Sequence, residues 1–171
     1  MPCGLLWIFL DGVGWGEADP ERNPLARLRL PTLEGLAGGR LAGRSPDSPP
    51  RYFPLDARLG VEGLPASGTG QTSLLTGVNA AAWVGEHRGP YPGAALHPLL
   101  RQRSVFRAAT QAGLSAAFAN AFPTRYLRRI QAEGGRQGAF TRAALQARIP
   151  LRGAEDLRQG RAVSARLSHG S

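Results

Sequence analysis

The sequence predicts an α/β fold in which helices cover both faces of a mostly parallel sheet. Residues 5–10 (LLWIFL) form a short, continuous apolar run that ends at Asp11, a pattern typical of a strand buried on both faces. Residues 114–122 (LSAAFANAF) form a second apolar run, which ends at Pro123. A segment with helical spacing precedes this second run, and helix followed by strand is the rhythm of a parallel sheet.

Local signals between and after these runs predict the other elements. Residues 31–37 begin with proline, place Leu33 and Leu36 on one side and are followed by two glycines, so they predict a helix. A short strand is expected at 55–61, and a glycine-rich turn at 67–72 leads into a helix at 73–80. The remaining predictions are helices at 99–112 and 139–148 and loops at 12–31, 43–54 and 85–98.

The composition of the 171 residues excludes several classes of protein. A chain of this length can bury roughly 70% of its unfolded surface, so it needs no disulfide bond or structural metal to form a core. Cys3 is the only cysteine and cannot form an internal bridge. No window holds the roughly 18 apolar residues of a membrane helix, and residues 1–10 lack the basic leader and cleavage site of a signal peptide. We therefore expect a cytoplasmic protein of one globular domain, without a membrane partner.

The net charge of +9 is concentrated in one part of the chain. Residues 1–100 hold eight arginines and nine acidic residues, whereas residues 101–171 hold thirteen arginines and three acidic residues, a local charge of +10. This excess raises the alternative of a basic nucleic-acid-binding module at 101–171. The segment has no RNP, KH or zinc-finger pattern, and most of its aromatic residues sit within apolar stretches, which argues against nucleic acid as a partner.

Asp11 is the first candidate for chemistry because it stands at the carboxyl end of a predicted buried strand. Open α/β sheets place their ligands at this edge, and a carboxylate there can hold a metal ion. The following loop carries three further acidic residues, Glu17, Asp19 and Glu21. The alternative is that Asp11 is an ordinary turn residue or helix cap.

Residues 67–77 (SGTGQTSLLTG) form the second candidate. Glycines allow a backbone to approach an anion, and the free N–H groups at the start of a helix point at it. A nucleophilic hydroxyl at this place would face a substrate phosphate, whereas the alternative is a Ser or Thr cap on an ordinary helix. The helix contributes about 0.3–1 kcal/mol to a nearby negative charge. A bound metal contributes roughly 12 kcal/mol through the pKa of its water. The helix alone therefore cannot activate the hydroxyl, whereas a metal ion can. Because Asp11 can hold a metal ion, we expect Asp11 and Ser67 to belong to one site.

Three segments resemble the alkaline phosphatase superfamily, especially its phosphoglycerate mutase and phosphopentomutase branch. The opening IFLDGVGWG is similar to the first strand and metal-binding aspartate of that superfamily, and PTLEGLA at 31–37 is similar to a PTL-acid-x-LA segment of the branch. Residues 67–77 have the register of the sulfatase motif C-x-P-S-R-x-x-L-L-T-G, with Ser67 at the position of the nucleophile. Five later residues further resemble a metalloenzyme subgroup of this superfamily: Asn79, Gly85, His87, Pro90 and Gly93.

The resemblance implies phosphoryl or sulfuryl transfer or hydrolysis on a small phosphorylated substrate, with two divalent ions, Mn or Zn. Ser67 would be the nucleophile and a metal ligand, Thr69 the alternative nucleophile, and Asp11 a metal ligand. The backbone at Gly68, Gly70 and Gln71 would bind the phosphate. Residues 1–128 would form the N-terminal part of the family's core, and residues 129–171 a basic helical segment that starts a cap or an insertion.

The chain departs from the family pattern in its later residues. The superfamily completes its metal site with downstream D-x-x-x-H and D-H pairs, and this sequence contains neither. The histidines are His87 and His97 in one loop, where we expect a surface or packing role, and His169 near the end. Arg166 stands where an aspartate is usual. We therefore expect an incomplete, truncated form of the fold whose uncovered sheet surface favours self-association, with a catalytically inactive fragment as the alternative.

Overall fold

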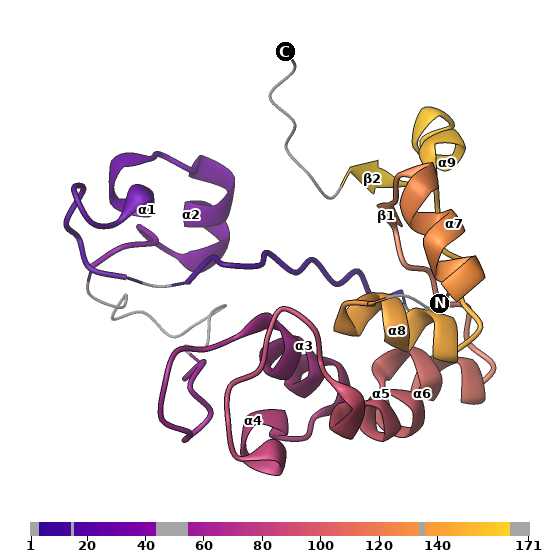
Figure 1. Ribbon diagram of the computed structural model, residues 1–171. Coiled ribbons are helices and arrows are strands. Elements are labelled where there is room, and N and C mark those ends of the chain that lie inside the picture. Colours follow the sequence, from indigo (N-terminus) through magenta and orange to yellow (C-terminus); the bar gives the residue numbers. More distant parts are fainter. Residues whose placement is uncertain (1–3, 15, 44–54, 134–135, 165–171) are drawn as a thin grey trace. The chain divides into compact units, whose positions relative to one another are not determined.

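The computed structural model describes residues 4–14, 16–43, 55–133 and 136–164, and the chain forms two compact units, residues 1–56 and 57–171 (Figure 1). Most of the regular secondary structure in these described residues is helical. None of the helices in the described ranges is both long and apolar enough to cross a membrane.

The first unit contains two short helices, α1 (Pro24–Arg27) and α2 (Pro31–Ala37). Each begins at a proline, whose fixed φ suits the first turn and whose missing N–H is not needed there. The side chain of Asn23 accepts the N–H of Leu25 at 3.1 Å and caps α1. Gly38, at a φ of 77°, ends α2. The helix predicted at 31–37 is therefore confirmed.

The second unit has a core of four helices, α3 (Ser67–Thr76), α5 (His97–Arg103), α6 (Val105–Gln111) and α8 (Ala139–Gln146). Helix α3 packs against α5 and α8, and α8 also contacts α6. The main apolar cluster joins Leu75, Leu100, Ala139 and Ala143, with Phe106 and Phe140 at its border. The small alanines of α8 let its neighbours approach closely, and each buried leucine contributes about 1.5–3 kcal/mol.

Two short helices and two short strands complete this unit. Helix α4 (Ala80–Val84) and the 3-10 helix η1 (Ala94–Leu96) pack beside α3 and α5 around Ala80, Leu96 and Leu99. Strands β1 (Asn120–Ala121) and β2 (Val163–Ser164) pair in parallel. The chain between them forms α7 (Thr124–Glu133), α8 and α9 (Ala154–Arg158), because parallel strands need a long crossover. Figure 1 shows α7 and α9 beside this strand pair.

The predicted mostly parallel sheet with helices on both faces is wrong. The described residues are largely helical, and their named strands are two residues each. Residues 5–10 form no strand, and Leu5 is 87% exposed. Residues 55–61 form turns, and the run at 114–122 becomes a strand only at its end. A strand needs a neighbour for its N–H and C=O groups, and an apolar run cannot show whether that neighbour exists.

Two helix boundaries also differ from the prediction. The helix expected at 99–112 is divided into α5 and α6 by Ser104, which is fully buried and whose hydroxyl accepts the N–H of Arg107 at 3.3 Å. Residues 67–72, expected as a turn, are the first turns of α3. The two compact units divide between Asp56 and Ala57, and the predicted boundary between residues 128 and 129 stays a prediction.

Candidate active site

The first turn of α3 carries the sequence-predicted nucleophile, and a loop of the same unit holds it in place. Ala66 precedes the helix in an extended conformation and has no side-chain acceptor for the first N–H groups. The carbonyl oxygen of Arg88 accepts the N–H of Thr69 at 2.9 Å instead. The hydroxyl of Thr69 accepts the N–H of Arg88 at 3.2 Å. The loop at 85–93 thus supplies the cap that the sequence before the helix does not.

Gly68 is required by this contact between loop and helix. A Cβ at Gly68 would lie 2.5 Å from the carbonyl oxygen of Arg88 and closer still to that of Tyr91, so any side chain would displace the loop backbone. Gly89 approaches from the other side, where a Cβ would lie 3.2 Å from the backbone nitrogen of Ser67. Both glycines serve close packing of two backbones. Carbonyl oxygens beside Gly68 present negative partial charge, which does not attract a phosphate.

Four hydroxyl groups of α3 each donate to a main-chain carbonyl oxygen three or four residues earlier, a bond that a helical serine or threonine commonly makes. These bonds run from Thr69 to Ala66 (3.2 Å), Thr72 to Gly68 (2.6 Å), Ser73 to Thr69 (3.0 Å) and Thr76 to Thr72 (2.7 Å). Ser67 is the first residue of the helix, so no helical turn precedes it, and it is half-buried, whereas Thr69 is fully buried.

One of the predicted phosphate-binding N–H groups, that of Gly70, is already in use: it donates to the carbonyl oxygen of Ala66 at 2.9 Å. The neighbouring N–H of Thr69 donates to the carbonyl oxygen of Arg88. Gly70 has open space where a side chain would stand, and Gln71 is half-buried in the second turn. The binding roles of Gly68, Gly70 and Gln71 stay predictions.

The acidic residues of the first unit form local contacts. Asp11 is exposed in a turn with Gly12. Glu17 and Glu21 form exposed ion pairs with arginines of the same unit, and Asp19 accepts the N–H of Glu21 at 2.8 Å. Asp11 and Ser67 belong to different units, and their common site stays a prediction.

Histidines and metal ligands do not gather in the described part of the chain. The Nε2 atom of His87 lies 3.2 Å from the carbonyl oxygen of Val61, which is a packing contact between two loops. In residues 4–14, 16–43, 55–133 and 136–164, no group of three or more His, Cys, Asp or Glu could hold a metal ion. The two divalent ions expected from the resemblance stay a prediction. His169 and Arg166 lie outside the described residues.

Burial affects two basic groups on neighbouring helices, His97 at the start of α5 and Arg142 on α8. Burial lowers the pKa of His97, and the charge of Arg142 lowers it further. Burial also lowers the pKa of Arg142, whose Nε has no hydrogen-bond partner among the described residues. Burial and the charge of Arg142 thus both disfavour the protonated form of His97.

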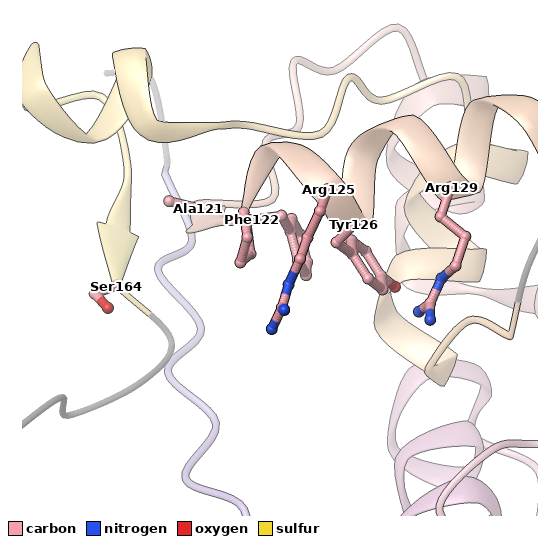
Figure 2. A pocket seen from close by; sticks show the side chains of 7 residues that line it. Ala121, Phe122, Arg125, Tyr126, Arg129 and Ser164 are labelled. Atoms are coloured by element: carbon pink, nitrogen blue, oxygen red, sulfur yellow. The ribbon is translucent and has the colours of Figure 1, made fainter.

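A pocket of about 620 Å³ beside α7 is a site that the sequence did not predict. Figure 2 shows Arg125, Tyr126 and Arg129 projecting from one side of this helix. The signal in the sequence was the pair of arginines four residues apart, which share one face of a helix. The strand ends that line the other side of the pocket are more than 40 residues apart in sequence, at Ala121 and Ser164, so only the fold brings them together.

Comparisons with protein-family models, with curated proteins and with solved structures give no match. The resemblance to the alkaline phosphatase superfamily therefore stays a prediction that depends on the sequence motifs.

Proposed function

We propose that this chain carries the nucleophile of a phosphoryl- or sulfuryl-transfer reaction and that Ser67 is that nucleophile. The observation that carries the proposal is the position of Ser67. It is the half-buried first residue of a ten-residue helix, in a turn that two hydrogen bonds between Thr69 and Arg88 hold to the loop at 85–93, whereas the side chain of the alternative, Thr69, is fully buried. A fixed nucleophile loses little freedom on reaction.

The chemistry proposed for Ser67 is an in-line displacement. Its Oγ forms a bond to phosphorus as the ester P–O bond breaks, and the leaving alkoxide takes up the proton that Ser67 loses. The product is a phosphoserine, which water then hydrolyses. No step is assigned to a metal, because the described residues do not supply a ligand set.

Covalent labelling tests this assignment more directly than turnover. Catalytic metal sites generally use three or more protein ligands, so we expect turnover by this chain to be slow. The folded chain is incubated with p-nitrophenyl phosphate or p-nitrophenyl sulfate and Mn²⁺ or Zn²⁺, and the modified residue is identified by mass spectrometry. We expect the label on Ser67, no label in Ser67→Ala, and an unchanged label in Ser115→Ala, which removes an exposed serine outside the helix. A label on another residue, or none on a folded protein in excess ester, would contradict the proposal.

A further inference from the structure

The pocket beside α7 lies where two parallel strands end. Ala121 and Ser164 are the last residues of β1 and β2, are paired in register, and both line the pocket. Phe122 and Pro123 continue the lining toward the start of α7. Ligands of sheets with parallel strands commonly bind at this end of the strands. The volume of about 620 Å³ lies within the range of small-molecule sites, about 300–1,000 Å³.

Two guanidinium groups from one helical face supply the charge of this pocket. Arg125 and Arg129 are four residues apart on α7, and Figure 2 shows both side chains on the pocket side. Like charges at this spacing repel each other. Among the side chains that the structure describes, which do not include that of Glu133, no carboxylate lies within ion-pair distance of either arginine. A bound dianion would relieve this repulsion and accept hydrogen bonds from both groups.

Aromatic rings hold this face of α7 in place before any ligand binds. The guanidinium carbon of Arg129 lies 5.4 Å from the ring centre of Tyr126. The ring of Tyr126 stacks on Phe122, with centres 4.9 Å apart and planes at 19°, and Phe122 contacts Phe118 in turn. A preorganised arginine loses less conformational freedom on binding than a mobile one.

We propose that this pocket binds a small organic phosphate monoester, with the phosphate between Arg125 and Arg129 and the apolar part against Phe122 and Pro123. A nucleic-acid strand fits less well, because it needs a basic groove that follows several phosphates, whereas these two arginines lie within about one helical turn. The proposal is independent of Ser67, since no residue of α3 lines the pocket.

Calorimetric titration of the folded chain with phenyl phosphate tests the proposal. We expect saturable binding that weakens about tenfold or more in Arg125→Gln and in Arg129→Gln, because each removes a charge-assisted contact. Arg128→Gln is the matched control: it removes the same charge from the same helix, but Arg128 does not line the pocket, and the affinity should change by less than about twofold. Glutamine has nearly the helix propensity of arginine, and circular dichroism confirms that each variant is folded.

Further arms of the same experiment separate the alternatives. Phenyl phosphate should bind about tenfold more tightly than inorganic phosphate, since only the former reaches the apolar lining. Equal affinities would overturn the organic-ester part of the proposal. Ser115→Ala, which changes an exposed serine outside the pocket, should bind phenyl phosphate as the unmodified chain does. Equal losses in all three arginine variants would indicate general cationic attraction, and tighter, salt-sensitive binding of a single-stranded oligonucleotide would indicate a nucleic-acid surface. Either result, or no saturable binding, would overturn the proposal.

Discussion

Helices α3 and α7 each have ten residues, yet their first turns are used in opposite ways. The start of α3 is rich in glycine, which suggests an anion site, but the loop at 85–93 covers it with carbonyl oxygens. The first two turns of α7 have no glycine, yet they present Arg125 and Arg129 to an open pocket. Glycine at a helix start can therefore allow the close approach of either an anion or another backbone segment. Which of the two approaches depends on what the fold places beside the helix start.

The largest effect should come from Gly68→Ala. The added methyl group would overlap the backbone carbonyls of Arg88 and Tyr91, so the loop must move and the cap on Thr69 is lost. We expect the free energy of unfolding to fall by about 3 kcal/mol, measured by urea denaturation.

Gly70→Ala is the matched control, because the same change two residues later meets open space. Alanine has a higher helix propensity than glycine, so this variant should be more stable by about 0.5–1 kcal/mol. If both variants lose stability equally, the loop does not require Gly68, and the contrast between α3 and α7 fails.

Thr69→Val should have the second largest effect. Valine keeps the shape but removes the hydroxyl that accepts the N–H of Arg88 and donates to Ala66. The N–H of Arg88 then loses its acceptor, and unfolding should require about 2 kcal/mol less. Thr110→Val serves as the control, because the half-exposed Thr110 makes one bond to the carbonyl oxygen of Arg107. A loss in Thr110→Val as large as in Thr69→Val would show that the loop contact adds nothing.

The elements predicted correctly are those whose signals are local. Helix α2 has its proline start and its glycine end within eight residues, and the sequence predicts it at 31–37. Helix α8 lies within the predicted range 139–148. The strands were wrong because a strand depends on a distant partner, and the apolar run at 5–10 has no assigned strand partner in the described chain.

The candidate site shows the same division between local and distant information. The sequence predicts a glycine-rich turn at 67–72 before a helix at 73–80, whereas Ser67 is itself the first residue of α3. The loop that covers the start of α3 comes from about 20 residues later, and no local signal gives this contact. The pocket at α7 combines β1 and β2 across a crossover, so the sequence showed only its two arginines.

A smaller effect should separate stability from binding at α7. Arg125→Glu replaces a repulsion with Arg129 by an attraction and places a negative charge in the first turn, so we expect the unliganded protein to gain about 0.5 kcal/mol. The same variant should lose phenyl phosphate binding. The gain should vanish in about 1 M salt, where such charges are screened. If Arg125→Glu loses stability at low salt, Arg125 makes a structural contact, and the contrast between α3 and α7 fails.

The smallest effect concerns a third helix start, where His97 begins α5 beside Arg142. Burial, and secondarily the charge of Arg142, lowers the pKa of His97 below the ordinary histidine value of 6.5, so the unfolded chain binds a proton more readily than the folded one. Above that pH His97 is neutral in both states and contributes nothing, and as the pH falls below it the free energy of unfolding should decrease. His97→Gln should remove this part of the pH dependence. In Arg142→Gln the pKa of His97, measured by NMR, should rise only partway toward 6.5, because burial remains the larger cause. A full return to 6.5 in Arg142→Gln would instead make charge the dominant factor at this helix start, as it is at α7.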